Sequence, residues 1–142
     1  FQRNIRQTNL SFGSLFITEI FTMAFRNTGG CIMNTNKIAE LNDKLRKNLL
    51  SPSKNKVVLT VGVSSLPLIE QMLLLKKVKD FNDFTPDNNV YNENDFGKIT
   101  HNNTDYFWKI DYYDNNCELG SADPSNPDIT TRVLTIMRAD EY

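Results

Sequence analysis

Hydrophobic and polar residues alternate most regularly in the last third of the chain. Between positions 105 and 113 the even-numbered residues are all aromatic or aliphatic, whereas the odd-numbered ones mix aromatic rings with Lys109 and Asp111. Successive side chains of a strand point to opposite faces, so this alternation predicts a strand with one face in the core. The other face is expected to be half covered or to line a groove.

Turn residues define the strands on either side. His101-Asn-Asn-Thr104 predicts a hairpin connection to a short strand at 96–100. A last strand is predicted at 131–138, after a loop rich in proline and asparagine. We expect Trp108 to be a core residue and His101, the single histidine, to be solvated in its turn.

Two helices and one more strand are predicted before these strands. Apolar residues recur at helical spacing from Ile38 to Leu49, which predicts a helix that begins at Asn34, Thr35 or Asn36 and ends before residue 51. The β-branched run Val57–Val63 predicts a strand buried on both faces. A second helix is predicted from about 66 to 79, with a wide apolar stripe that implies burial against a sheet, made of Leu68, Ile69, Met72, Leu73, Leu75 and Val78.

The order of these elements predicts the fold class. A helix, a strand and a helix followed by three strands indicate an α+β fold, with two helices packed on a mostly antiparallel sheet of about four strands. A length of 142 residues fits one domain.

Composition narrows the function classes. A net charge of −1 argues against nucleic-acid binding, which normally requires a basic excess. The longest apolar runs fall far short of the roughly 18–20 residues that span a bilayer. The two cysteines form neither a disulfide framework nor a metal-binding pair, which favours a reduced, cytoplasmic setting.

The first 32 residues differ from the rest of the chain. The stretch Phe12–Phe25 is apolar but shows no sustained helical or alternating period. The codons for Thr28–Met33 can spell a bacterial ribosome-binding sequence shortly before the Met33 codon. We therefore expect residues 1–32 to be upstream sequence translated in frame, or otherwise a disordered N-terminal arm, and residues 33–142 to form a single α+β domain.

Acidic residues are the main candidates for chemistry. If the predicted strands are neighbours, the carboxylates of Glu93, Asp95, Asp111 and Asp114 could converge at one end of the sheet. Three or four convergent carboxylates can hold Mg²⁺ or Mn²⁺ and support hydrolytic or phosphoryl chemistry. In the alternative reading, Asp111 pairs with Lys109 or Arg132 across the sheet and the acids of the following loop make turn hydrogen bonds.

Several motifs resemble a known family. Trp108-Lys-Ile-Asp-Tyr-Tyr-Asp114, Gly120-Ser-Ala-Asp-Pro124 and Thr131-Arg-Val-Leu-Thr-Ile-Met137, followed by Ala139-Asp-Glu-Tyr142, are similar to an uncharacterised family of small bacterial proteins, found chiefly in alphaproteobacteria and their plasmids and phages. Ile38–Arg46 resembles the opening helix of that family. The resemblance implies an intact fold and a bacterial origin but no mechanism. Members commonly carry Glu-His-Asp-Phe-Gly, and Asn94 stands here in place of that histidine.

Two functions remain open from the sequence. The first is a small cytoplasmic accessory module, possessing no cofactor, that binds another protein through Phe107, Lys109 and Tyr113 and is carried by mobile elements. The alternative is a metal-dependent hydrolase or nuclease-like enzyme. Its catalytic candidates are Asp111, Asp114 and Arg132, with Lys109 as a further group to stabilise charge and Mg²⁺ or Mn²⁺ as the metal. The sequence leaves the oligomeric state open.

Overall fold

The computed structural model describes residues 32–142. The hypothesis about the first 32 residues therefore lies almost wholly outside the described residues and stays a prediction. Helix α2 (Ile32–Lys47) begins before the predicted N-caps, so Asn34 to Asn36 lie within its first turns.

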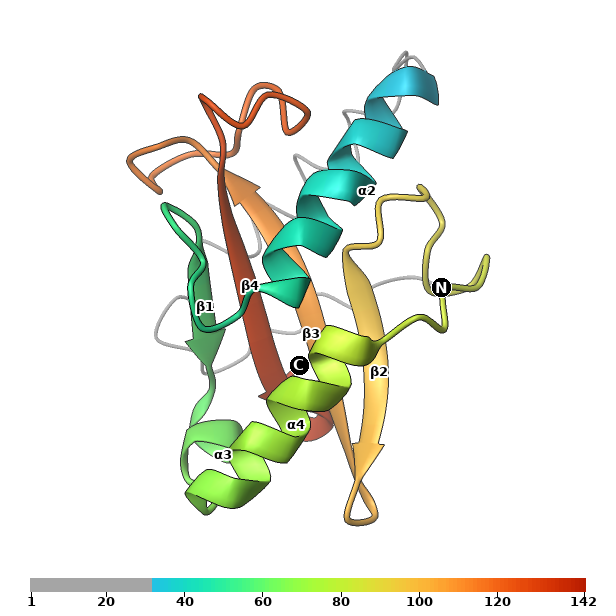
Figure 1. The fold of residues 1–142 in the computed structure, drawn as a ribbon, viewed down its shortest axis with the longest axis vertical. Helices are drawn as coiled ribbons and strands as arrows, with labels where there is room; N and C mark the ends of the chain where they lie inside the picture. Colours follow the sequence, from blue (N-terminus) through green and yellow to red (C-terminus); the bar gives the residue numbers. More distant parts are fainter. Residues whose placement is uncertain (1–31) are drawn as a thin grey trace.

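The architecture is a four-stranded sheet with helices on one face (Figure 1). The strand order is β1-β4-β3-β2; β1 runs parallel to β4, and the other neighbours are antiparallel. The strands are β1 (Lys56–Leu59), β2 (Phe96–His101), β3 (Thr104–Tyr113) and β4 (Thr131–Arg138). The predicted α+β fold with a mostly antiparallel four-stranded sheet is confirmed.

Helices α2 and α4 (Leu68–Asp80) cross the same side of the sheet (Figure 1). A one-turn helix, α3 (Val61–Ser64), and a short 3-10 helix, η1 (Ala139–Glu141), complete the described elements. The two long helices match the predicted pair.

The β2–β3 hairpin forms where the turn residues predicted it. Asn102 and Asn103 both have positive φ angles, 49° and 59°. A type I′ turn, a common two-residue hairpin loop, needs such angles at both positions, and asparagine tolerates them better than most residues. The hairpin fixes the register, in which Gly97 lies opposite Trp108 and His101 opposite Thr104.

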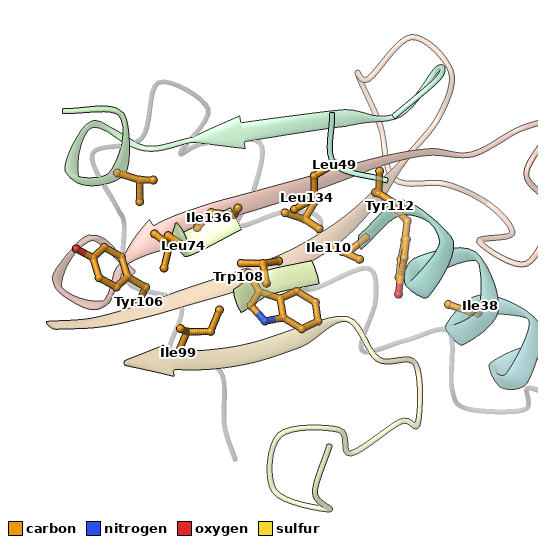
Figure 2. Close-up of a cluster of buried hydrophobic side chains, with 13 residues drawn as sticks. Ile38, Leu49, Leu74, Ile99, Tyr106, Trp108, Ile110, Tyr112, Leu134 and Ile136 are labelled. Atoms are coloured by element: carbon orange, nitrogen blue, oxygen red, sulfur yellow. The ribbon is translucent and has the colours of Figure 1, made fainter. Parts of the chain in front are cut away.

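The hydrophobic core lies between the sheet and the helices. Trp108, Ile110, Leu134 and Ile136 of the two central strands have no exposed surface. Side chains of the three described α-helices pack against them: Ile38, Leu45, Val63, Leu74 and Val78 (Figure 2 shows most of this cluster). Each large apolar side chain buried in this way contributes about 1.5–3 kcal/mol. Trp108 is the core residue that the sequence predicted.

Arg46 connects α2 to the C-terminal end of α4. Its guanidinium donates hydrogen bonds to the carbonyl oxygens of Val78 (3.0 Å) and Lys79 (2.8 Å). It also lies 5.5 Å from the ring centres of Phe84 and Trp108. A cation at the carbonyl end of a helix satisfies free acceptors and interacts favourably with the helix dipole. Arg46 therefore fixes the crossing of the two long helices.

The prediction of a strand over Val57–Val63, buried on both faces, is wrong in two respects: the strand is shorter, and it lies at the edge of the sheet. β1 ends at Leu59 and is a half-buried edge strand, because it pairs only with β4 among the described strands. The chain then turns into α3, whose first amides face Glu141. The Glu141 carboxylate accepts hydrogen bonds from the Gly62 amide (2.7 Å) and the Thr60 hydroxyl (2.5 Å). A negative charge at a helix N-terminus stabilises it, so a contact 79 residues away along the chain converts the end of the β-branched run into a helix.

Candidate functional site

The four candidate metal ligands do not share one environment, and Asp95 and Glu93 are the two whose charges act on Tyr112. Glu93 is on the helix side of the sheet, where its Oε2 accepts a hydrogen bond of 3.0 Å from the Tyr112 hydroxyl. Asp111 is on the opposite side, because it alternates with Tyr112 along β3. Asp114 lies past the end of β3, and its Oδ1 accepts a hydrogen bond from the Glu118 amide at 3.0 Å. The sheet thus separates Asp111 from Glu93.

No metal centre is formed by the part of the chain that the structure describes. Within residues 32–142, no three or more histidine, cysteine, aspartate or glutamate side chains are grouped so that they could hold a metal ion. Asp111 instead forms an ion pair with Lys109, with Nζ 2.8 Å from Oδ2. Of the two partners that the sequence left open for Asp111, the structure selects Lys109.

A buried polar network, rather than a metal site, surrounds Glu93. Asn42 of α2 is at its centre and is fully buried. Its amide donates hydrogen bonds to the Tyr112 hydroxyl (2.7 Å) and the Glu93 carbonyl (2.8 Å), and its Oδ1 accepts one from Arg132 Nε (2.8 Å). This network ties α2 to β3, to β4 and to the segment that leads into β2.

Burial, helped by nearby charges, keeps the Tyr112 hydroxyl neutral. Burial raises the pKa of Tyr112 well above its usual value, and the negative charges of Asp95 and Glu93 raise it further. A neutral hydroxyl can donate to Glu93 while it accepts from Asn42. In Figure 2 the Tyr112 side chain extends from the sheet towards α2. The sequence signal for this site was Tyr112 on the core face, but the asparagine on α2 gave no sign of its role.

Arg132 is a structural member of this network. It has 2% of its surface exposed, lies 5.3 Å from the centre of the Tyr112 ring, and donates to the carbonyl of Pro124. Its contacts anchor the proline-rich loop to the sheet. The guanidinium of Arg132 is thus held by fixed partners, and the catalytic role considered from the sequence stays a prediction.

A cavity of about 550 Å³ lies next to Arg132. The end of α2 and the loops before β1 and β4 line it with polar and charged side chains, among them Lys44, Asn48, Lys54, Asn55, Asp128 and Arg132. No cysteine or histidine is among its lining residues.

The residues predicted as a contact surface are mostly interior. Lys109 and Tyr113 each have 3% of their surface exposed. Phe107 is half buried, with its ring centre 5.4 Å from that of Phe96 and 5.3 Å from that of Tyr142. Lys109 and Tyr113 are therefore buried rather than half covered, and a protein contact through Phe107, Lys109 and Tyr113 stays a prediction.

The exposed apolar residues lie on α4 instead. Four residues that the sequence assigned to a buried stripe are accessible, namely Leu68 (72% exposed), Ile69 (61%), Met72 (56%) and Leu73 (43%). We name these four residues the α4 surface. The helix contacts the core through Leu74 and Val78 on another side. The prediction failed because α4 is apolar on two sides, and only one of them faces the sheet.

A groove adjoins the α4 surface. It measures about 670 Å³, lies between α4 and β2, and begins at Leu73, with Phe81 and Ile99 as its other apolar lining residues. Lysines and aspartates line it as well: Lys76, Lys77, Asp80, Asp83 and Lys98. His101 closes one end and is buried, with Nε2 2.5 Å from Glu70 Oε2. The expectation of a solvated histidine is therefore wrong.

Fold and surface together define a small α+β domain with an apolar helix surface and dispersed carboxylates. The chain belongs to the family described as "Protein of unknown function (DUF3768)", whose model matches residues 59–141. The resemblance to a family of unknown function is thus confirmed over residues 59–141, whereas Ile38–Arg46 lies outside the match. No curated protein and no solved structure matches the chain.

The described helices are also informative about membranes. None of those in residues 32–142 is both long enough and apolar enough to cross a bilayer.

Proposed function

We propose that this protein is a small protein-binding accessory module that acts through the α4 surface. The observation that carries the proposal is the exposure of Leu68, Ile69, Met72 and Leu73 on one helix. Residues four apart lie one above the other on a helix, so the pairs 68/72 and 69/73 form a continuous apolar ridge. Contiguous exposed apolar patches mark interaction sites on folded proteins.

The surroundings of the ridge favour a protein partner. The groove between α4 and β2 extends the apolar surface from Leu73 to Phe81 and Ile99. Charged residues border it, as in protein interfaces with an apolar centre and a polar rim. A partner of matching chemistry presents an apolar groove for the α4 ridge and a side chain that enters the space beside Leu73. This is the helix-in-groove mode of recognition.

We propose that the protein acts in the bacterial cytoplasm and is encoded on mobile elements. A net charge of −1 supports a protein partner over nucleic acid. The mobile-element setting rests on the family resemblance alone. The metal-dependent enzyme gains no support from the described carboxylates, so we do not propose it.

Photo-cross-linking tests the proposal. A photo-reactive phenylalanine analogue replaces Met72 in the full chain, and the same analogue at the exposed Lys47 serves as the control. We expect a specific adduct with another protein from the Met72 position and none from Lys47. The captured protein is then purified and its affinity measured against the wild-type chain and against Met72→Asp.

The affinity measurement decides the outcome. We expect Met72→Asp to weaken binding at least tenfold, because a buried charge without a partner is costly at an interface. Equal affinity for both chains would overturn the proposal. So would a wild-type dimer that Met72→Asp converts to a monomer, because the ridge would then join two copies of this chain.

A further inference from the structure

The sheet has a second face, on the side away from the three α-helices of residues 32–142. Side chains of the central strands alternate, so the neighbours of the core residues point to this side. The register places them next to one another across the strands. We define the second sheet face by Phe96, Lys109, Asp111, Val133, Thr135 and Met137.

This face is buried although no described α-helix lies on it. Asp111, Thr135 and Met137 have no exposed surface, and Val133 has 7%. The buried apolar side chains of α2, α3 and α4 belong to the core on the opposite side. Tyr142 contacts Phe96 and Phe107, which accounts for one end of the face only.

Buried polar atoms of this face also lack hydrogen-bond partners within the described residues. Asp111 Oδ1 and Thr135 Oγ1 are buried and have no hydrogen-bond partner among residues 32–142. Lys109 balances the charge of Asp111 through Oδ2. Buried polar atoms nearly always have hydrogen-bond partners, so what covers this face must combine apolar side chains with hydrogen-bond donors.

We propose that the segment Phe12–Phe25 of the same chain docks on the second sheet face. It carries large apolar residues that can pack against Val133, Met137 and Phe96. Between them lie hydroxyl residues that can donate hydrogen bonds to Asp111 and Thr135. Its apolar residues include Leu15, Phe16, Ile17, Ile20 and Phe21, and its hydroxyl residues are Ser14, Thr18 and Thr22. The segment thus matches both requirements of the face.

The chain is long enough for this docking. Residues 26–31 separate the segment from α2, whose N-terminal end extends beyond the end of the sheet (Figure 1). At roughly 3.3–3.6 Å per extended residue, this linker spans about 20 Å. A sheet layer is about 10 Å thick, so the linker can pass around the end of the sheet to its second face. The proposal requires residues 12–25 to be part of the working protein and so opposes the hypothesis of a misread start.

Intramolecular cross-linking tests the docking in the full chain. A photo-reactive phenylalanine analogue replaces Phe107, which borders the second sheet face, and the control carries it at Phe84 on the helix side. After irradiation, we expect peptides from residues 12–25 to be joined to position 107 of the same chain and not to position 84. Adducts between two chains would overturn the proposal in favour of a second copy on this face. The absence of any adduct with residues 12–25 would also overturn it.

A substitution provides an independent measurement. Ile17→Asp in the full chain should lower the melting temperature by several degrees and speed amide hydrogen exchange in β3 and β4. Asn9→Asp, outside the segment, is the matched control with the same added charge. Equal melting temperatures and equal exchange rates for the two variants would show that the segment does not dock.

Discussion

Gly97 on β2 lies directly opposite Trp108 on β3, and the indole occupies the space where any other residue would place its Cβ. A Cβ at Gly97 would lie 2.4 Å from Trp108 Nε1 and 2.8 Å from Phe81 Cζ. The ring cannot retreat easily, because Phe81 and Phe84 pack against it edge-on at 5.4 and 6.3 Å. A glycine in the middle of a strand is explained here by the close approach of a tryptophan.

Gly97→Ala should therefore destabilise the protein by about 1–3 kcal/mol, the usual cost of overpacking a core. Urea unfolding followed by tryptophan fluorescence measures this free energy. In a Trp108→Phe background, the smaller ring makes room, and the same substitution should cost much less. An unchanged cost in that background would mean that Trp108 is not the cause of the clash.

Tyr112→Phe should destabilise the protein by about 1–3 kcal/mol at neutral pH, because it removes the hydroxyl shared by Asn42 and Glu93. The pH dependence adds a second signature. Burial raises the pKa of Tyr112 in the folded state above its usual value of 10.0, so the unfolded chain loses this proton first as the pH rises. The contribution of the hydroxyl to the free energy of unfolding is therefore full below pH 10 and decreases as the pH rises above that value.

Chemical denaturation at pH 7 and at pH values above 10 checks both parts. The gap in unfolding free energy between wild type and Tyr112→Phe should narrow at the higher pH. Tyr106→Phe removes a hydroxyl outside the network and is the matched control. A gap that stays constant with pH would contradict the assignment of a raised pKa to Tyr112.

Parts of this fold followed directly from the sequence. The hairpin was predictable because two asparagines tolerate positive φ angles, and the core face of β3 because four apolar residues alternate there. Both signals are local: they depend on neighbours one to four residues apart.

The errors concern features decided by distant residues. The end of β1 and the start of α3 depend on Glu141, which no local pattern connects to Gly62. The α4 surface was assigned to the core because periodicity shows which apolar residues share one face of a helix. It does not show which face of the helix packs against the sheet. The carboxylates could not be placed, because a one-residue step in register moves a side chain to the other face.

Arg46→Met should destabilise the protein by about 2 kcal/mol, because two carbonyl groups at the end of α4 lose a charged hydrogen-bond donor. Amide exchange in the last turn of α4 should accelerate more than elsewhere. Lys47→Met is the matched control, since Lys47 is exposed and adjacent in sequence. Similar losses for both variants would contradict a specific role for Arg46.

Asp111→Asn should destabilise the protein by about 3–5 kcal/mol, since it removes the carboxylate charge from the buried ion pair with Lys109. Asp105→Asn, which breaks the exposed pair with Lys98, should change stability little. The double variant Lys109→Met with Asp111→Leu should recover much of the loss, because apolar residues of similar volume can replace a buried ion pair. Thermal denaturation of the three variants compares them. Equal effects for the buried and exposed pairs would show that the second sheet face is open to water.

Met72→Asp should leave the unfolding free energy within about 0.5 kcal/mol of wild type, because Met72 is exposed and makes no contribution to the core. Leu74→Ala, two residues further along the same helix, should cost about 2–5 kcal/mol, because Leu74 is fully buried. Urea unfolding of both variants separates the two sides of α4. A large loss for Met72→Asp would mean that the ridge is held by the fold of this chain, and the surface proposed for a partner would not exist. A small loss, with binding abolished, would show that selection for a partner rather than for folding keeps four apolar residues on this helix exposed.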